Sequence, residues 1–166
     1  MTDAEVLSLD VFDTVLVRAC GAPEALFLWV GRRLVSRGLL DCSPESFARV
    51  RHRVERTVWE REGGLDAPVT LGDFYAELVR GLRLDPAVTD SLIAHELALE
   101  EEMLRPAPQA AELLAAAAYS GVPVIFVSDT YFSARFLERQ LERHGLWPAG
   151  ARCFSSSDAG ASKESG

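Results

Sequence analysis

An apolar segment near the N-terminus ends in an acidic residue, and this feature constrains the fold more than any other. Residues 5–11 read Glu-Val-Leu-Ser-Leu-Asp-Val, and their aliphatic side chains predict a buried strand. Asp10 lies at the carboxyl end of that strand, where burial of an ionised side chain is unfavourable without a partner or a ligand. Because ligands bind at the carboxyl ends of strands in open α/β sheets, Asp10 is the first candidate functional residue.

Two later segments also place polar side chains directly after an apolar strand. Residues 122–128 read Val-Pro-Val-Ile-Phe-Val-Ser and predict a second strand that ends at Ser128, with Asp129 next. Residues 151–155 predict a short third strand, and a loop rich in Ser and Gly then leads to Lys163 at an expected helix start. The sequence therefore predicts an α/β fold with a parallel sheet.

Most of the chain between the first two strands has helical periodicity. Ser43-Pro44 supplies an N-cap followed by Pro at the first helical position, and the spacing of Thr70 and Asp73 resembles a capping box. The acidic run 100–102 is expected to face solvent. The expected helices cover residues 23–38, 43–63, a segment from 70, 85–105, 108–119 and a segment from 133 to 145.

Composition restricts the possible functions. The 166 residues include 17 basic and 25 acidic side chains, which give a net charge of −8, and no Lys/Arg stripe indicates nucleic acid binding. No apolar segment is long enough to cross a membrane, and no signal peptide is visible. Cys20, Cys42 and Cys153 are odd in number and far apart, which favours reduced thiols and a cytoplasmic location.

The three strand ends resemble the first three motifs of the haloacid dehalogenase-like (HAD) hydrolase superfamily. The resemblance implies a partial Rossmann-like, three-layer core with a parallel sheet, formed by residues 1–19 and 106–166. It also implies an inserted all-helical cap at residues 20–105, which would close over the active site and select the substrate.

The resemblance assigns roles to individual residues. Asp10 would be the nucleophile that forms an aspartyl phosphate, Ser128 would donate a hydrogen bond to the phosphoryl group, and Lys163 would neutralise its charge. Thr14 and Asp129 are expected close to the substrate or behind the residues that contact it. The implied reaction is hydrolysis of a small phosphorylated metabolite, with Mg²⁺ bound by the Asp10 side chain and the Phe12 carbonyl.

The segment departs from the superfamily pattern at Phe12. Most phosphatases of the superfamily have a second Asp there, which serves as general acid and base. Asp13 follows directly and is the candidate to replace it, although neighbouring residues of an extended chain face opposite ways. Superfamily dehalogenases have an aromatic residue at this position, so a dehalogenase-like hydrolase is an alternative. The motifs are most similar to an uncharacterised bacterial subfamily that is sometimes fused to glycosyltransferases.

The fourth superfamily motif, a strand followed by an acidic pair, has no counterpart after Lys163. In the family fold that strand lies beside the first one, so residues 6–10 are expected to form an open sheet edge. We therefore expect a truncated chain, or a partner or further domain that completes the sheet. A catalytically inactive binding module is the third functional hypothesis.

Overall fold

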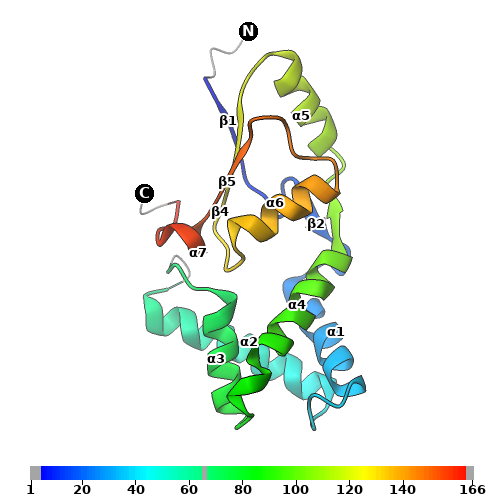
Figure 1. Cartoon of the computed structure of the whole chain (residues 1–166), viewed down its shortest axis with the longest axis vertical. Helices are drawn as coiled ribbons and strands as arrows, with labels where there is room; N and C mark the ends of the chain where they lie inside the picture. Colours follow the sequence, from blue (N-terminus) through cyan, green and yellow to red (C-terminus); the bar gives the residue numbers. More distant parts are fainter. Residues whose placement is uncertain (1–4, 65–66, 164–166) are drawn as a thin grey trace.

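The computed structural model describes residues 5–64 and 67–163 of the chain (Figure 1). Residues 1–4 and 164–166, which the sequence analysis assigns to the core, lie outside the described residues. The helix expected to start at Lys163 falls on those C-terminal residues and is likewise outside them.

Three short strands form a parallel sheet. β1 (Leu7–Leu9) pairs with β4 (Val124–Ser128), and β4 pairs with β5 (Arg152–Ser155), so β4 is the central strand. Along β4 the buried residues alternate with partly buried ones, as expected for a strand covered more closely on one face. The predicted α/β class and its parallel sheet are confirmed, although β1 is shorter than the predicted 5–11.

Four helices gather at the end of the molecule away from this sheet (Figure 1). They are α1 (Pro23–Ser36), α2 (Pro44–Glu62), α3 (Leu71–Gly81) and α4 (Thr89–Met103), with a short 3-10 helix, η1 (Pro86–Val88), before α4. The predicted caps are present: the Ser43 hydroxyl accepts from the Ser46 amide, and Thr70 and Asp73 form a reciprocal capping box. These helices fall within residues 20–105, but the exact limits of a cap domain stay a prediction.

A glycine allows close packing of the first two helices. A Cβ atom added to Gly31 in α1 would lie 2.8 Å from the carbonyl oxygen of Pro44, the first residue of α2. A larger residue would therefore push the two helices apart.

Two strands that the sequence analysis did not predict join the helical group to the sheet. β2 (Leu16–Arg18) and β3 (Leu104–Pro106) pair antiparallel, with Arg18 opposite Leu104. The fourth helix was expected to continue to residue 105, but it ends at Met103. Pro106 explains the change, because the residue before a proline prefers an extended conformation. Figure 1 shows β2 between the sheet and the group formed by α1 to α4.

Three further helices pack around the parallel sheet. They are α5 (Ala110–Tyr119), α6 (Ala134–Arg143) and α7 (Ser156–Ala159). α6 buries Phe136, Leu137 and Leu141, as its periodicity predicts. α7 replaces part of the expected Ser/Gly loop. None of the helices in the described part of the chain combines the length and the apolar character of a membrane span.

The buried face of α4 contradicts the expectation of a solvated acidic run. Glu96 and Glu100 are one helical turn apart, and neither is exposed. Glu100 accepts from Arg18 Nε at 2.6 Å, and Glu96 accepts two hydrogen bonds from Arg51. The expectation was wrong for Glu100 because its cationic partner comes from a distant strand.

One edge of the parallel sheet is open. Among the described residues, β1 pairs with β4 only, and the other side of β1 has no neighbouring strand. Val6, just before β1, is 45% exposed. This arrangement agrees with the predicted open edge at residues 6–10.

Candidate active site

An ion pair joins the two ends of the described chain. Lys163 Nζ lies 3.1 Å from Asp10 Oδ1, and the side chains are 36% and 43% exposed. The Val11 amide donates to the same oxygen at 2.8 Å. The second carboxylate oxygen of Asp10 takes part in neither contact, so it is the one more available to a ligand.

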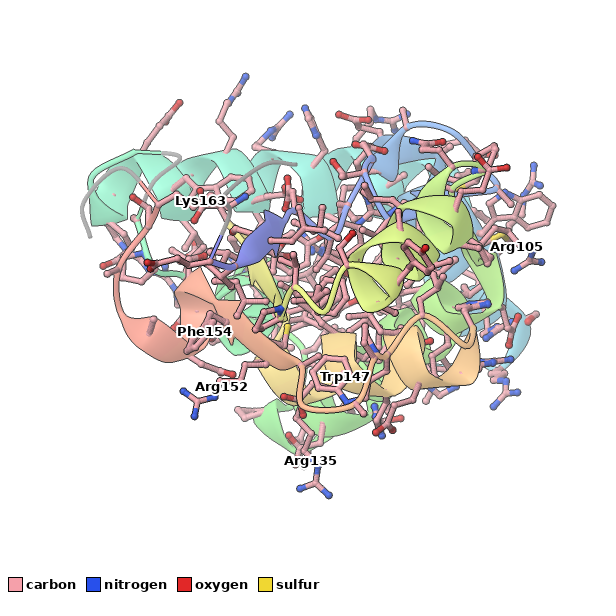
Figure 2. All side chains as sticks on the ribbon, turned by 90° about the horizontal axis from the view of Figure 1, so that it is seen from above. Arg105, Arg135, Trp147, Arg152, Phe154 and Lys163 are labelled. Atoms are coloured by element: carbon pink, nitrogen blue, oxygen red, sulfur yellow. The ribbon has the colours of Figure 1, made fainter. Side chains whose placement is uncertain are left out.

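Asp129 positions the segment that carries this lysine. Its Oδ1 accepts from the main-chain amide of Lys163 at 3.0 Å. Asp129 directly follows β4, so the hydrogen bond ties the C-terminal segment to the carboxyl end of the central strand. Figure 2 shows that Lys163 turns back over the molecule, whereas Arg135 and Arg152 project from its rim.

Ser128 is the last residue of β4 and is only 1% exposed. The sheet register places Leu9 beside Phe126, so Asp10 and Ser128 both lie at the carboxyl ends of neighbouring parallel strands. The structure thus brings Asp10, Asp129 and Lys163 together through direct contacts, and places Ser128 at the same end of the sheet. Their predicted catalytic roles stay predictions.

A tight turn follows Asp10. The amides of Val15 and Leu16 both donate to the Val11 carbonyl, at 3.0 and 2.8 Å. Asp13 has a positive φ of 58°, its amide donates to the Leu16 carbonyl, and its side chain is exposed. Thr14 is partly buried within this turn.

Phe12 lies between an aromatic ring and a guanidinium group. Its ring centre is 5.8 Å from that of Phe132, and the Arg18 Cζ lies 4.5 Å from the Phe12 ring centre. Arg18 is held in turn by the buried carboxylate of Glu100. Burial raises the pKa of Glu100 to about 7, although the Arg18 charge acts in the opposite direction.

Sequence reasoning did not identify Arg18, Glu100 or Phe132 as neighbours of the candidate site. An arginine four residues after the Phe-Asp-Thr turn carries no motif signal, and the contact depends on the unpredicted pairing of β2 with β3.

A cluster of serine hydroxyls holds the loop that follows Ser128. The Thr130 amide donates to Ser156 Oγ at 2.9 Å. The hydroxyls of Ser155 and Ser157 both donate to the Phe132 carbonyl, at 2.5 and 2.9 Å. The serine-rich segment therefore fixes the main chain around Phe132, the ring that contacts Phe12.

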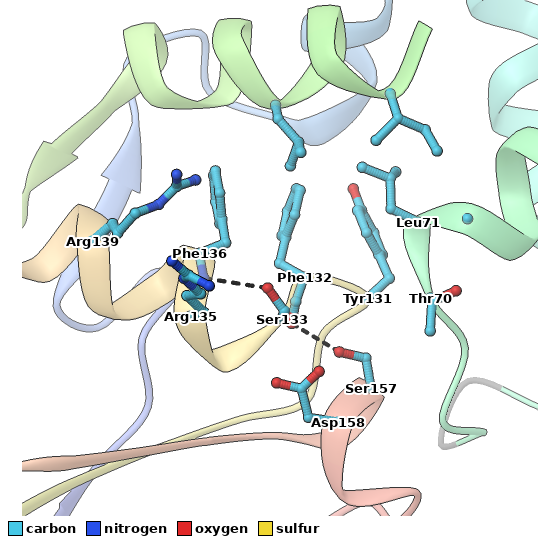
Figure 3. A pocket seen from close by; sticks show the side chains of 13 residues that line it. Thr70, Leu71, Tyr131, Phe132, Ser133, Arg135, Phe136, Arg139, Ser157 and Asp158 are labelled. Carbon is cyan, nitrogen blue, oxygen red and sulfur yellow. Dashed lines mark hydrogen bonds between the residues drawn. The ribbon is translucent and has the colours of Figure 1, made fainter. Parts of the chain in front are cut away.

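A cavity of about 330 Å³ is lined in part by Phe132 and lies between the helical group and α6 (Figure 3). Apolar side chains from both sides line it, including Leu71, Tyr131 and Phe136, and Arg135 and Arg139 lie at its border. Phe132 lines this cavity, and its ring also contacts the ring of Phe12.

The candidate site offers the type of donor atom that a magnesium ion prefers. The Asp10 carboxylate and the Phe12 carbonyl are hard oxygen donors, and the turn hydrogen bonds described above use the Val11 carbonyl rather than that of Phe12. Within residues 5–64 and 67–163, no group of three or more His, Cys, Asp or Glu side chains forms a metal cluster. Mg²⁺ commonly takes one or two carboxylates and completes its shell with water and substrate phosphate, so two donors are a compatible protein contribution.

The fold matches solved structures of HAD proteins. YfnB from Bacillus subtilis, assigned as a HAD hydrolase and bound to magnesium, is 18% identical with a TM-score of 0.57 over 98% of this chain. L-2-haloacid dehalogenase from Xanthobacter autotrophicus is 16% identical with a TM-score of 0.54 over 96% of this chain. A predicted phosphoglycolate phosphatase from Haemophilus somnus is 14% identical with a TM-score of 0.53 over 94% of this chain. The predicted HAD-like fold is thereby confirmed.

The chain spans 68%, 60% and 64% of the lengths of these three structures, respectively. No protein-family model and no curated protein matches the sequence. Likeness at these identities concerns the fold, and the similarity to a subfamily fused to glycosyltransferases stays a prediction.

Proposed function

We propose that the protein is a phosphohydrolase in which Asp10 attacks a phosphate monoester and forms an aspartyl phosphate. The observation that carries this proposal is the 3.1 Å contact between Asp10 and Lys163 at the carboxyl end of the sheet. A carboxylate nucleophile and a phosphate group repel each other, and a fixed ammonium group reduces that repulsion.

The reaction would proceed in two steps. First, the free carboxylate oxygen of Asp10 bonds to phosphorus while the bond from phosphorus to the leaving-group oxygen breaks. Second, the oxygen of a water molecule bonds to phosphorus while the bond from the Asp10 oxygen to phosphorus breaks. Phosphate leaves, the proton of the water passes to phosphate or to solvent, and the Asp10 carboxylate is regenerated. Ser128 would donate a hydrogen bond to a phosphoryl oxygen, and Asp129 would hold Lys163 in position through its main-chain amide.

The identity of the cation supports this assignment. The chain has 17 basic residues, and Lys163 is the only lysine among them. A lysine presents a compact ammonium charge, whereas an arginine presents a broad, planar group that forks across two acceptors. The single departure from arginine thus occurs at the residue that contacts Asp10.

Magnesium would be held by the Asp10 carboxylate and the Phe12 carbonyl. When bound, it would neutralise phosphoryl charge and orient the phosphate for attack. We further propose a small phosphorylated metabolite as the substrate and the cytoplasm as the location. The three free cysteines fit its reducing conditions.

Dehalogenation is the second candidate, and Phe12 is the observation that favours it. Displacement of halide from carbon by Asp10 needs no proton donor, so an aromatic residue next to the nucleophile is compatible with that chemistry. Release of halide from 2-haloacids, lost in Asp10→Asn, would support this alternative, whereas its absence would remove it.

The decisive experiment uses the protein as its gene encodes it, with and without Mg²⁺. We expect phosphate release from a phosphate ester panel, loss of release in Asp10→Asn, and a trapped phosphoryl group on Asp10 after acid quench. Arg152→Gln changes an exposed strand residue and serves as the control. Phosphate release that persists in Asp10→Asn would contradict the proposal.

A further inference from the structure

Phe12 shares the accessible side of the turn with Asp10. Val11 between them is completely buried, whereas Asp10 and Phe12 are both partly buried, so the two side chains emerge on the same side of the backbone. Phe12 is therefore the first side chain after Asp10 on the accessible side of this turn. A phenyl ring neither donates nor accepts a proton.

Among the described residues, the groups that contact the Phe12 ring do not replace a proton-transfer group. Its ring contacts Phe132 at 5.8 Å on one side and the Arg18 guanidinium at 4.5 Å on another. A guanidinium keeps its proton at every working pH. Glu100, which accepts from Arg18 Nε at 2.6 Å, is completely buried. These contacts hold an aprotic group beside the nucleophile.

This environment limits which leaving groups can depart. When Asp10 oxygen bonds to phosphorus, the bonding electron pair leaves with the oxygen of the leaving group. Without a proton donor, that oxygen departs as an anion. Its ease of departure then follows the pKa of the corresponding acid, which is about 4 for a carboxylic acid and about 10 for a phenol. The pKa of an alcohol lies well above that of a phenol, so an alkoxide is the poorest leaving group of the three.

We infer that the site selects phosphoryl compounds with a stable anionic leaving group, namely acyl and aryl phosphates, and discriminates against alkyl phosphates. This inference rests on the proposed phosphohydrolase function. It narrows the substrate class from phosphate monoesters in general to those that need no protonation as the bond to phosphorus breaks. Arg18 is a positioning residue in this scheme, because it acts through Phe12.

A leaving-group series tests the inference. The substrates are acetyl phosphate, phenyl phosphates with leaving-group pKa values from about 5 to about 10, and glycerol phosphate as the alkyl member. We expect kcat/KM to fall steeply as the leaving-group pKa rises, with the alkyl ester at least about 100-fold slower than the most reactive phenyl ester, the range that general acid catalysis normally supplies.

Two variants test whether Phe12 causes the dependence of kcat/KM on the leaving-group pKa. Phe12→Asp places a carboxyl group beside the nucleophile, and we expect it to flatten the dependence by accelerating the alkyl ester relative to the reactive phenyl esters. Phe154→Asp makes the same chemical change at an exposed phenylalanine of β5 (Figure 2), and we expect it to retain the wild-type slope. If Phe12→Asp does not fold, the slope of the wild-type protein alone still decides the matter.

The outcomes separate this inference from the proposed function. A flat dependence in the wild-type protein, with glycerol phosphate hydrolysed as fast as the phenyl esters, would overturn the inference and leave the phosphohydrolase intact. A steeper slope in Asp13→Asn would also overturn it, because Asp13 would then be the proton donor. No phosphate release and no phosphoryl group on Asp10 with any substrate, acetyl phosphate included, would reject both.

Discussion

Arg51 donates to both carboxylate oxygens of Glu96, at 3.0 and 2.8 Å, and neither side chain has any exposed surface. Tyr75 donates to the same carboxylate at 2.6 Å, and Glu55 accepts from Arg51 at 3.0 Å. Burial, followed by the Glu96 charge, raises the pKa of Tyr75 well above its ordinary value, so its hydroxyl remains a donor. This network joins α2, α3 and α4 at their centre.

Breaking the Arg51–Glu96 pair on one side will destabilise the protein strongly. We expect Arg51→Met to lower the free energy of unfolding by about 3 to 5 kcal/mol, because an uncompensated carboxylate would remain buried. Urea unfolding measures the change. Arg56→Met is the matched control on the same helix: its side chain is 67% exposed beside Glu60, and exposed pairs contribute about 0 to 1 kcal/mol. Equal losses in the two variants would contradict this account.

Glu100 will give the stability a specific pH dependence. The pKa of this carboxyl is about 7 in the folded protein and 4.5 ordinarily, because burial disfavours its charge. Between these values the folded state keeps a proton that the unfolded chain releases, so this residue makes the free energy of unfolding fall as the pH rises.

Glu100→Gln removes that contribution. Over the window from pH 4.5 to 7, we expect wild-type protein to lose about 1 to 3 kcal/mol more stability than the variant. Chemical unfolding at several pH values measures the difference. Glu60→Gln changes a side chain that is 70% exposed, so its free energy of unfolding should depend on pH as that of the wild type does. The same wild-type pH dependence in Glu100→Gln would show that Glu100 is not the group responsible.

Lys163 will matter for turnover far more than for stability. We expect Lys163→Met to lower kcat about 100-fold to 1,000-fold, the usual effect of losing one fixed group that stabilises transition-state charge. Thermal unfolding should shift little, because the ion pair with Asp10 is partly exposed. Lys163→Arg keeps the charge and should recover only part of the activity.

The absence of another lysine offers an independent measurement. Acylation of amines modifies only Lys163 and the N-terminal amine in this chain. Vanadate or phosphate should protect Lys163 from the reagent, as followed by peptide mass spectrometry. Unprotected modification at saturating vanadate would argue against a phosphate site at this lysine.

The second chemical step will be slow relative to the first when the leaving group is good. Water that attacks the aspartyl phosphate must lose a proton, and Phe12 cannot accept it. We expect a reactive phenyl phosphate to release a burst of phenol close to one equivalent of protein, followed by slower steady turnover. Rapid-quench kinetics will detect the burst. Phenol release that is linear from the start, without a burst, would place the slow step before the aspartyl phosphate.

Local signals were sufficient to predict much of the fold. Ser43-Pro44 and the Thr70 and Asp73 pair each fix a helix start through hydrogen bonds within a few residues, and both caps are present. The strand that ends at Ser128 is an apolar run of ordinary length, which makes its signal clear.

Other features depend on contacts between distant parts of the chain. β2 and β3 have three residues each, too few for an alternating pattern to stand out, and they exist because they pair with each other. Glu100 belongs to an acidic run that resembles a solvated surface, and only the position of Arg18 across the chain makes its burial possible.

The candidate site also combines residues that local sequence motifs predict with a contact that depends on distant parts of the chain. The positions of Asp10 and Lys163 follow from motifs at strand ends, and their contact agrees with the resemblance. The contact of Arg18 with Phe12 was not predictable, because it requires the turn geometry after Asp10 and the register of β2 together.

The pairing of β2 with β3 has a consequence for chain topology. Arg18 and Leu104 are register partners, so the segment between them leaves and re-enters the rest of the molecule at a single point. The helices α1 to α4 thus form one very long loop that connects β2 to β3. The entropic cost of closing a loop grows only with the logarithm of its length. Insertions or deletions between β2 and β3 therefore change the cost of pairing these two strands only slightly. Residues 19–103 nevertheless cover part of the core, because Trp59 and Phe74 pack against Tyr131 in the loop after β4. Changes of length are therefore best tolerated away from these two side chains.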